Sequence, residues 1–202
     1  MIAATVAGVA VPVEEVDARE ARLRGGPLAA ALPAAGTSEG RQLRRWLTQL
    51  IVTERVIAAE AGALGVTASE APTEEELLPD VTARLELGSV AAAVLAEPLA
   101  RAVFARVTAT IDVSDDDVAD YHARNPLRFA TVPPGRHGWR GAAVAAPPLE
   151  QVRSVIAEHL RAAARRRAFR VWLDARRAAQ VRLAPGYEHP GDPRQPDNTH
   201  RH

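Results

Sequence analysis

The side chains best suited to metal chemistry lie near the C-terminus of this sequence. His189, His200 and His202, with Glu188 beside the first, offer the imidazole and carboxylate ligands that hold Ni or Zn in proteins. Their spacing matches no compact zinc motif, and the segment around them is rich in Pro and poor in core-forming residues. We therefore expect residues 184–202 to form an extended tail, solvated or docked, with metal handling as the alternative.

Other groups that could carry chemistry are few. The 202 residues include no Cys, which excludes disulfides, thiolate metal sites and Cys nucleophiles. The sequence contains no glycine-rich phosphate loop, no nucleophile elbow and no helical pair of His ligands. The acids at 115–117 follow Ser114 without the alternating ligands and central Gly of a calcium loop. We interpret them as the first turn of a helix that Ser114 caps, where the helix dipole favours acids.

The composition indicates a helical core with few large side chains. The net charge gives no sign of a nucleic-acid-binding surface. Hydrophobic residues make up 47% of the chain but aromatic residues only 4%, and 25 basic side chains balance 25 acidic ones. The charges are segregated, since residues 67–120 hold twelve acids and three Arg, whereas residues 149–182 hold nine Arg and three acids. We expect these two segments to face each other or to flank one groove, and we expect no nucleic-acid partner.

The sequence also predicts no membrane partner. No apolar run is long enough to span a bilayer. The apolar stretch Met1 to Val13 lacks the basic start of a signal peptide, because the first basic residue is Arg19. We therefore expect a cytoplasmic protein.

The element that must position any site is a long amphipathic helix that begins at Pro148 and runs into a short strand near Leu183. Its apolar residues recur at the three-and-four spacing of one helix face, and its other face is rich in Arg. A helix of this length cannot bury its apolar stripe alone, so residues 1–129 must pack on it. The apolar positions are Leu149, Val152, Ile156, Leu160, Ala163, Phe169, Trp172 and Leu173.

The first 129 residues predict a pair of strands followed by helices. Residues 5–11 alternate as two short strands around a turn at Ala7-Gly8. The periodicity predicts helices over residues 14–24, 39–64, 89–107 and 114–124. The predicted fold class is mainly α, with one small sheet that joins the N-terminal strands to a C-terminal strand at Val181.

Three local signals refine these boundaries. Ser38 is predicted to be the N-cap of the helix over 39–64. Pro98 is expected to break the helix over 89–107. A run of Glu after Thr73 predicts a further short, capped helix.

Three of these segments resemble the chaperone module of SurA-like and parvulin-type foldases. They are VAGVAVP (6–12), LTQLIVTERVIAAEAGALGV (47–66) and VSDDDVADYHARNPLRF (113–129). The last helix, with Phe-x-x-Trp-Leu at 169–173, is similar to the C-terminal segment of those proteins. The resemblance covers most of residues 4–183. It implies one helical module over residues 1–183 that binds protein clients.

The departure from that family concerns catalysis. In those foldases a parvulin prolyl isomerase domain usually follows the Asn-x-x-x-Phe segment, which here ends at Phe129. Only the short loop of residues 130–148 stands in its place, and so few residues cannot fold as a catalytic domain. His137 is therefore expected to belong to a loop rich in Pro and Gly, and we expect no prolyl isomerase activity.

The resemblance thus implies a noncatalytic, chaperone-like or assembly factor that needs no cofactor and binds a protein client in apolar grooves between helices. One alternative is a Ni- or Zn-handling maturation factor that uses the His-containing tail. Another is a fixed accessory subunit of an enzyme complex, which would bind one partner subunit. The residues predicted to contact the client are Trp46, Leu50, Phe104, Phe169 and Trp172.

Overall fold

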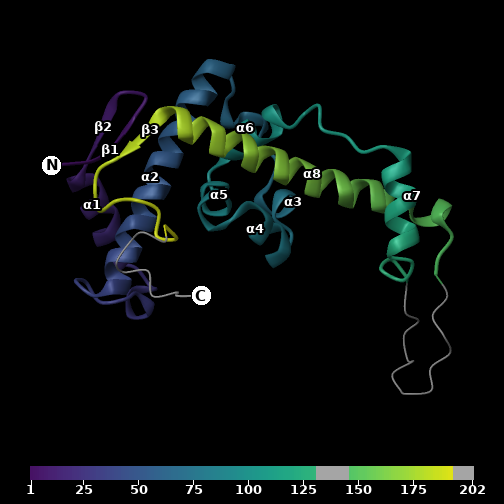
Figure 1. Ribbon diagram of the computed structural model, residues 1–202, viewed down its shortest axis with the longest axis horizontal. Coiled ribbons are helices and arrows are strands. Elements are labelled where there is room, and N and C mark those ends of the chain that lie inside the picture. The colour runs from purple at the N-terminus through teal and green to yellow at the C-terminus, as the bar shows by residue number, and fades with distance from the viewer. Residues whose placement is uncertain (131–145, 193–202) are drawn as a thin grey trace.

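The elements of this fold are arranged along one long helix. The computed structural model describes residues 1–130 and 146–192, which are mainly helical with one small sheet (Figure 1). The long helix α8, Leu149–Gln180, has 32 residues and is therefore about 48 Å long. It runs from α7 at one end of the molecule to the small sheet at the other. The predicted organising helix is confirmed.

A three-stranded antiparallel sheet in the order β2-β1-β3 ties the N-terminal strands to the end of α8. Its strands are β1 (Ile2–Val6), β2 (Val9–Pro12) and β3 (Val181–Leu183). Ala7 and Gly8 join β1 to β2 with φ angles of 48° and 82°, as a two-residue hairpin turn of type I′ requires. The Ala7 N–H donates to the carbonyl of Gln180, and the Ala184 N–H donates to that of Ala3, each at 2.9 Å. The predicted sheet is confirmed.

Two helices follow the hairpin and begin the body of the molecule. They are α1 (Val13–Arg24) and α2 (Ser38–Leu64), separated by a 3-10 turn over Ala29–Ala31. The N-cap of α2 is Thr37, so the prediction of Ser38 was wrong by one residue. Thr37 has extended backbone angles and its hydroxyl accepts a hydrogen bond from the Gly40 N–H at 3.0 Å, whereas Ser38 is already helical. Two adjacent hydroxyl residues give the same capping pattern in a sequence.

Four short helices complete the body. They are α3 (Glu74–Leu77), α4 (Val81–Leu87), α5 (Ser89–Val94) and α6 (Pro98–Val107). Pro98 occupies the first turn of α6, which confirms the predicted break, and Thr73 forms the predicted cap of α3 with Glu76. The sequence did not predict α4. Its start is fixed by the carboxylate of Asp80, which accepts from the Ala83 N–H at 2.8 Å.

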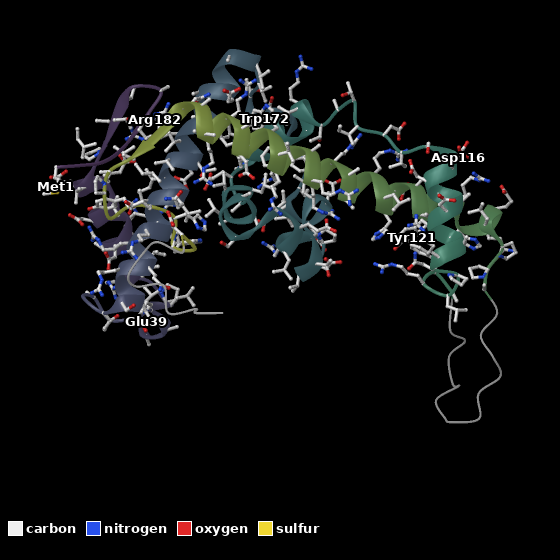
Figure 2. The ribbon with its side chains drawn as sticks, viewed as in Figure 1. Met1, Glu39, Asp116, Tyr121, Trp172 and Arg182 are labelled. Carbon is white, nitrogen blue, oxygen red and sulfur yellow. The ribbon has the colours of Figure 1, made fainter. Side chains whose placement is uncertain are left out.

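Helix α7 (Asp115–Arg124) stands apart from the body, at the start of α8. Ser114 and Asp117 form a reciprocal capping box at its N-terminus, as predicted. Figure 2 shows Asp116 in this first turn, at the outer end of the molecule. The acids at 115–117 therefore lie in the first turn of the helix, where its dipole favours negative charge, in agreement with the interpretation from the sequence.

The buried apolar side chains form two separate clusters along α8. The main core joins the sheet, α1, α2 and α4–α6, and it receives Phe169 and Leu173 from α8. The small core joins α7 to the first part of α8, with Tyr121 partly buried at its edge. Its buried members are Val118, Val152 and Ile156. Figure 2 shows the separation, since Trp172 lies beside the main core and Tyr121 lies at the α7 end.

The two oppositely charged segments face each other, as the sequence predicted. Their ion pairs are Arg166–Glu86 at 2.6 Å, Arg161–Asp112 at 2.8 Å and Arg153–Asp115 at 3.1 Å. Each pair joins α8 to a residue of α4, of the linker before α7 or of α7 itself. These contacts place three elements at defined positions along α8.

The residues directly after β3 dock on α2. The Gln49 side chain, which is 1% exposed, donates to the carbonyl of Tyr187 at 3.1 Å. The Arg45 Nε donates to the carbonyl of Gly186 at 3.2 Å, and the Tyr187 ring packs against the main core. The folded body therefore continues beyond residue 183, where the sequence analysis placed the start of the tail.

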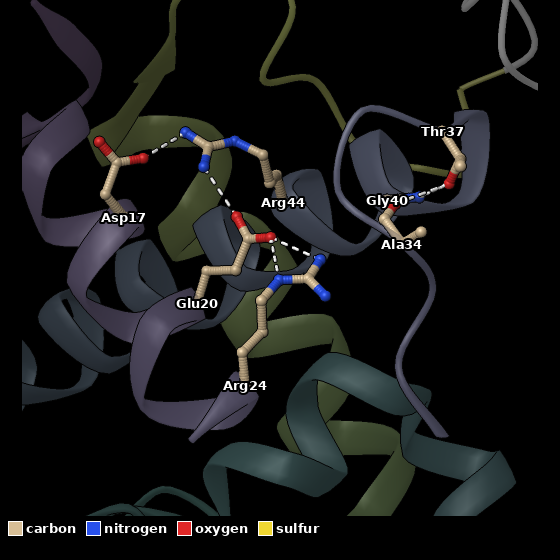
Figure 3. Close-up of polar contacts among 7 residues, drawn as sticks. All are labelled: Asp17, Glu20, Arg24, Ala34, Thr37, Gly40 and Arg44. Atoms are coloured by element: carbon tan, nitrogen blue, oxygen red, sulfur yellow. Dashed lines mark hydrogen bonds and ion pairs between the residues drawn. The ribbon is translucent and has the colours of Figure 1, made fainter. Parts of the chain in front are cut away.

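A carboxylate with two arginine partners connects α1 to α2 (Figure 3). Glu20 is only 7% exposed and accepts hydrogen bonds from Arg24 at 2.8 Å and from Arg44 at 2.7 Å. Arg44 also donates to Asp17 at 2.6 Å. Burial raises the pKa of Glu20 most strongly, but the hydrogen bonds from both arginines together outweigh it, so its pKa lies below the usual value.

We expect Gly40→Ala to lower the free energy of unfolding by about 1–3 kcal/mol, because an added Cβ would lie 2.3 Å from the carbonyl oxygen of Ala34. Figure 3 shows Gly40 between Ala34 and Thr37. Gly62→Ala is the matched control in the same helix, where nothing lies within 4 Å of the added Cβ. The Gly62→Ala change should raise the free energy of unfolding by about 1 kcal/mol. Urea unfolding of both variants measures the difference, and equal effects would contradict the packing at Gly40.

We expect Glu20→Gln to lower the free energy of unfolding at pH 7 by about 1–3 kcal/mol, because two charged hydrogen bonds are weakened. The pKa of Glu20 is depressed in the folded state, so its stabilising effect is present above the unfolded pKa of about 4.3. That effect is lost as pH falls through the folded pKa. The difference between wild type and variant should therefore shrink in urea titrations below about pH 4. Glu14→Gln, at a highly exposed side chain, should change stability by less than about 0.5 kcal/mol.

Candidate functional site

A groove of about 660 Å³ lies against the middle of α8, between the positions of the two cores. One wall is α8 itself from Glu158 to Arg166. The second wall is the end of α6 with the residues just after it, and the third is the segment that leads into α3. The residues of the second and third walls are Phe104, Ala105, Thr108, Ala109, Ala71, Pro72, Glu76 and Leu77.

The floor of this groove is apolar and firmly held. Phe104 is 3% exposed, and its ring centre lies 4.9 Å from that of Phe169 in the main core. The carbonyl of Phe104 at the end of α6 accepts hydrogen bonds from both the Thr108 N–H at 3.1 Å and the Thr108 hydroxyl at 2.8 Å. Ala105 and Ala162 contribute small side chains to the lining, and these leave room for an incoming group.

The sides of the groove carry three arginines from α8. Arg161 donates to Asp112 at 2.8 Å, and the side chain of Arg166 donates to Glu86 at 2.6 Å. The third, Arg165, has a buried Nε with no hydrogen-bond partner among the described residues. The groove therefore combines an apolar floor with one guanidinium that the described residues leave incompletely satisfied.

Two glutamates line the same groove but are placed differently. Glu76 accepts hydrogen bonds from the backbone and side chain of Thr73, at 2.7 and 2.9 Å. The backbone hydrogen bond and then the side-chain hydrogen bond from Thr73 hold the pKa of Glu76 below its usual value, which keeps it ionised and bound to its own helix start. Glu158 is exposed and lies seven residues before Arg165.

Of the five residues predicted to contact a client, only Phe104 lines this groove. Leu50 and Phe169 are buried in the main core, and Trp46 and Trp172 are partly buried against it. The Trp172 ring stacks on Phe169 with centres 5.6 Å apart. A helical repeat of large apolar residues marks a face that packs, and in these helices that face is covered by other elements.

The structure places one of the three histidines predicted to bind metal. His189 Nδ1 accepts a hydrogen bond from the Gly191 N–H at 3.0 Å. Within residues 1–130 and 146–192, no three His, Asp or Glu side chains are grouped closely enough to hold a metal ion. His200 and His202 lie outside the described residues, as does His137.

The small core contains a histidine that the sequence analysis did not count as a site residue. His159 Nε2 lies 3.3 Å from the Tyr121 hydroxyl, and its ring lies 6.0 Å from that of Phe129. Burial lowers the pKa of His159 most strongly, with a further contribution from Arg128. We interpret His159 as a packed member of this aromatic cluster, because its ring contacts both Tyr121 and Phe129.

Comparison with known proteins gives one partial match. A family of unknown function (DUF7158) matches residues 2–39, which comprise β1, β2, α1 and the first two residues of α2. No curated protein and no solved structure matches the chain. Among the described residues, no helix has both the length and the apolar character needed to cross a membrane.

Proposed function

We propose that this protein is a noncatalytic, chaperone-like or assembly factor that binds an extended segment of a client protein in the groove against α8. The observation that carries the proposal is the groove itself, with an apolar floor at Phe104 and arginines along α8. Its volume of about 660 Å³ lies within the usual range of binding clefts, about 300–1,000 Å³.

The position of the groove supports this function. The helical wall is joined to α4 by the ion pair between the buried Arg166 and Glu86, so the cleft is formed before a client arrives. Small side chains such as Ala162 face the space, which leaves room for client side chains of different shapes. The resemblance of residues 113–129 to the chaperone module of SurA-like foldases points to the same class of partner.

We expect Ala162→Trp to weaken binding of an unfolded client at least about tenfold, because the indole would fill the groove. Ala175→Trp is the matched control, since Ala175 is an exposed residue of the same helix outside the groove lining. The measurement is fluorescence anisotropy with a labelled, reduced and carboxymethylated protein that remains unfolded. Circular dichroism melting curves verify that both variants fold.

Equal binding by the two variants would contradict the assignment of the groove as the client-binding site. Failure of the wild-type protein to bind any unfolded client would favour the alternative of an accessory subunit dedicated to one partner. The two results are distinct, since the first compares variants and the second concerns the wild type alone.

We also expect no prolyl isomerase activity, because residues 130–148 are too few for a catalytic domain. In a protease-coupled peptide assay the protein should leave the slow uncatalysed rate unchanged. A concentration-dependent acceleration that disappears in His137→Ala would contradict this expectation.

A further inference from the structure

We propose that the groove selects client segments in which a carboxylate lies among apolar residues, and that Arg165 is the residue that recognises the carboxylate. This proposal rests on the proposed function and specifies the chemistry of its ligand. The partner is an extended protein segment that carries Asp or Glu next to aliphatic side chains.

Arg165 differs from the two other arginines that line the groove. Arg161 and Arg166 each have a carboxylate partner within 2.8 Å, and Arg166 is 5% exposed. Arg165 has no ion pair within 4.0 Å among the described residues, although it lies within electrostatic range of Asp112, the partner of Arg161, and its Nε is buried without an acceptor. A guanidinium presents its donors in a rigid fork that matches a carboxylate. Because this Nε is closed to solvent, a ligand would have to reach the other guanidinium nitrogens. Arg165 is the arginine of the groove lining that has no carboxylate partner among the described residues, so an incoming carboxylate would pair with it.

Neither of the two acids in the lining, Glu76 and Glu158, forms an ion pair with Arg165. Glu76 is held at the start of α3 by Thr73, at 2.7 and 2.9 Å. Glu158 precedes Arg165 by seven residues, which places it about 10.5 Å away along the helix axis. On the α8 wall, Arg161 is paired with Asp112 and Arg166 with Glu86, so a ligand carboxylate is favoured at Arg165.

Between Glu158 and Arg165 the groove also offers apolar side chains, beside Arg161, whose guanidinium is already bonded to Asp112. Ala162 lies between Glu158 and Arg165 on the same wall, and Phe104 and Ala105 face it from α6. Aliphatic side chains of a client would fill this space and exclude water from the carboxylate pair, which strengthens the charged hydrogen bonds. Nucleic acid is a poorer fit, since its repeating phosphates would meet Glu158 and Glu76 as well as Arg165.

The test uses the full chain and two labelled ten-residue peptides that differ at one side chain. Both contain a central Leu-Leu-X-Leu-Leu sequence, with X as Glu in one peptide and Gln in the other. We expect wild-type protein to bind the Glu peptide about tenfold more tightly in anisotropy titrations at low salt. This preference should decrease in 0.5 M NaCl, because salt screens the charge pair.

Arg165→Gln should abolish the preference by weakening only the Glu peptide. Arg167→Gln is the matched control, because Arg167 is exposed on the same helix and is absent from the groove lining. That variant should keep the tenfold ratio. Thermal melting should show both variants folded, since no described ion pair depends on either side chain.

Three outcomes overturn the proposal. Equal binding of both peptides by wild type removes the selectivity while leaving the groove as a client site. A preference that survives in Arg165→Gln assigns the recognition to another residue. Absence of binding of either peptide by wild type, together with failure to bind the unfolded client, removes the proposed function as well.

Discussion

The rest of the structure depends on the burial of α8 at two separate places. Val152 and Ile156 pack on α7, whereas Phe169 and Leu173 enter the main core. Ile156 and Phe169 are thirteen residues apart, which is about 20 Å along the helix. Among residues 1–130 and 146–192, the small core has three buried members, so α7 is held in place largely because α8 continues into the larger core. A break in α8 between these positions would separate the two cores.

The middle of α8 is held by charge where the cores do not reach. Arg161 and Arg166 connect it to the linker before α7 and to α4. The Arg161 pair is partly exposed and contributes little to stability. The Arg166 pair is more buried, so removing Glu86 would leave a guanidinium without its charged partner. These pairs fix where the linker and α4 sit along the helix, and that spacing leaves the groove between them.

Most of the fold could be predicted because its signals are local. The length and period of α8, the Pro98 break and the Ser114 cap are all visible in a few consecutive residues. Helix α4 has seven residues, too few for periodicity to distinguish it from a loop. The groove could not be predicted, because its walls come from three parts of the chain and much of its lining is Ala. Large apolar residues such as Leu50 and Phe169 were predicted to contact the client instead, and they are buried in the main core.

The family match and the groove concern different parts of the molecule. The matched residues 2–39 contain Asp17, Glu20 and Arg24, the last of which bonds Glu20, while Arg44, which donates to both carboxylates, lies just beyond the match. Every residue that lines the groove lies between Ala71 and Arg166. The matched segment therefore supplies the hairpin, whose strand β1 pairs with the C-terminal strand after α8, and the α1 side of the contact with α2. The anchored sheet fixes one end of α8, and the groove lies where that helix passes beyond the main core. A protein that shares only the matched segment would thus share the anchor, and its binding surface would depend on the residues beyond position 39.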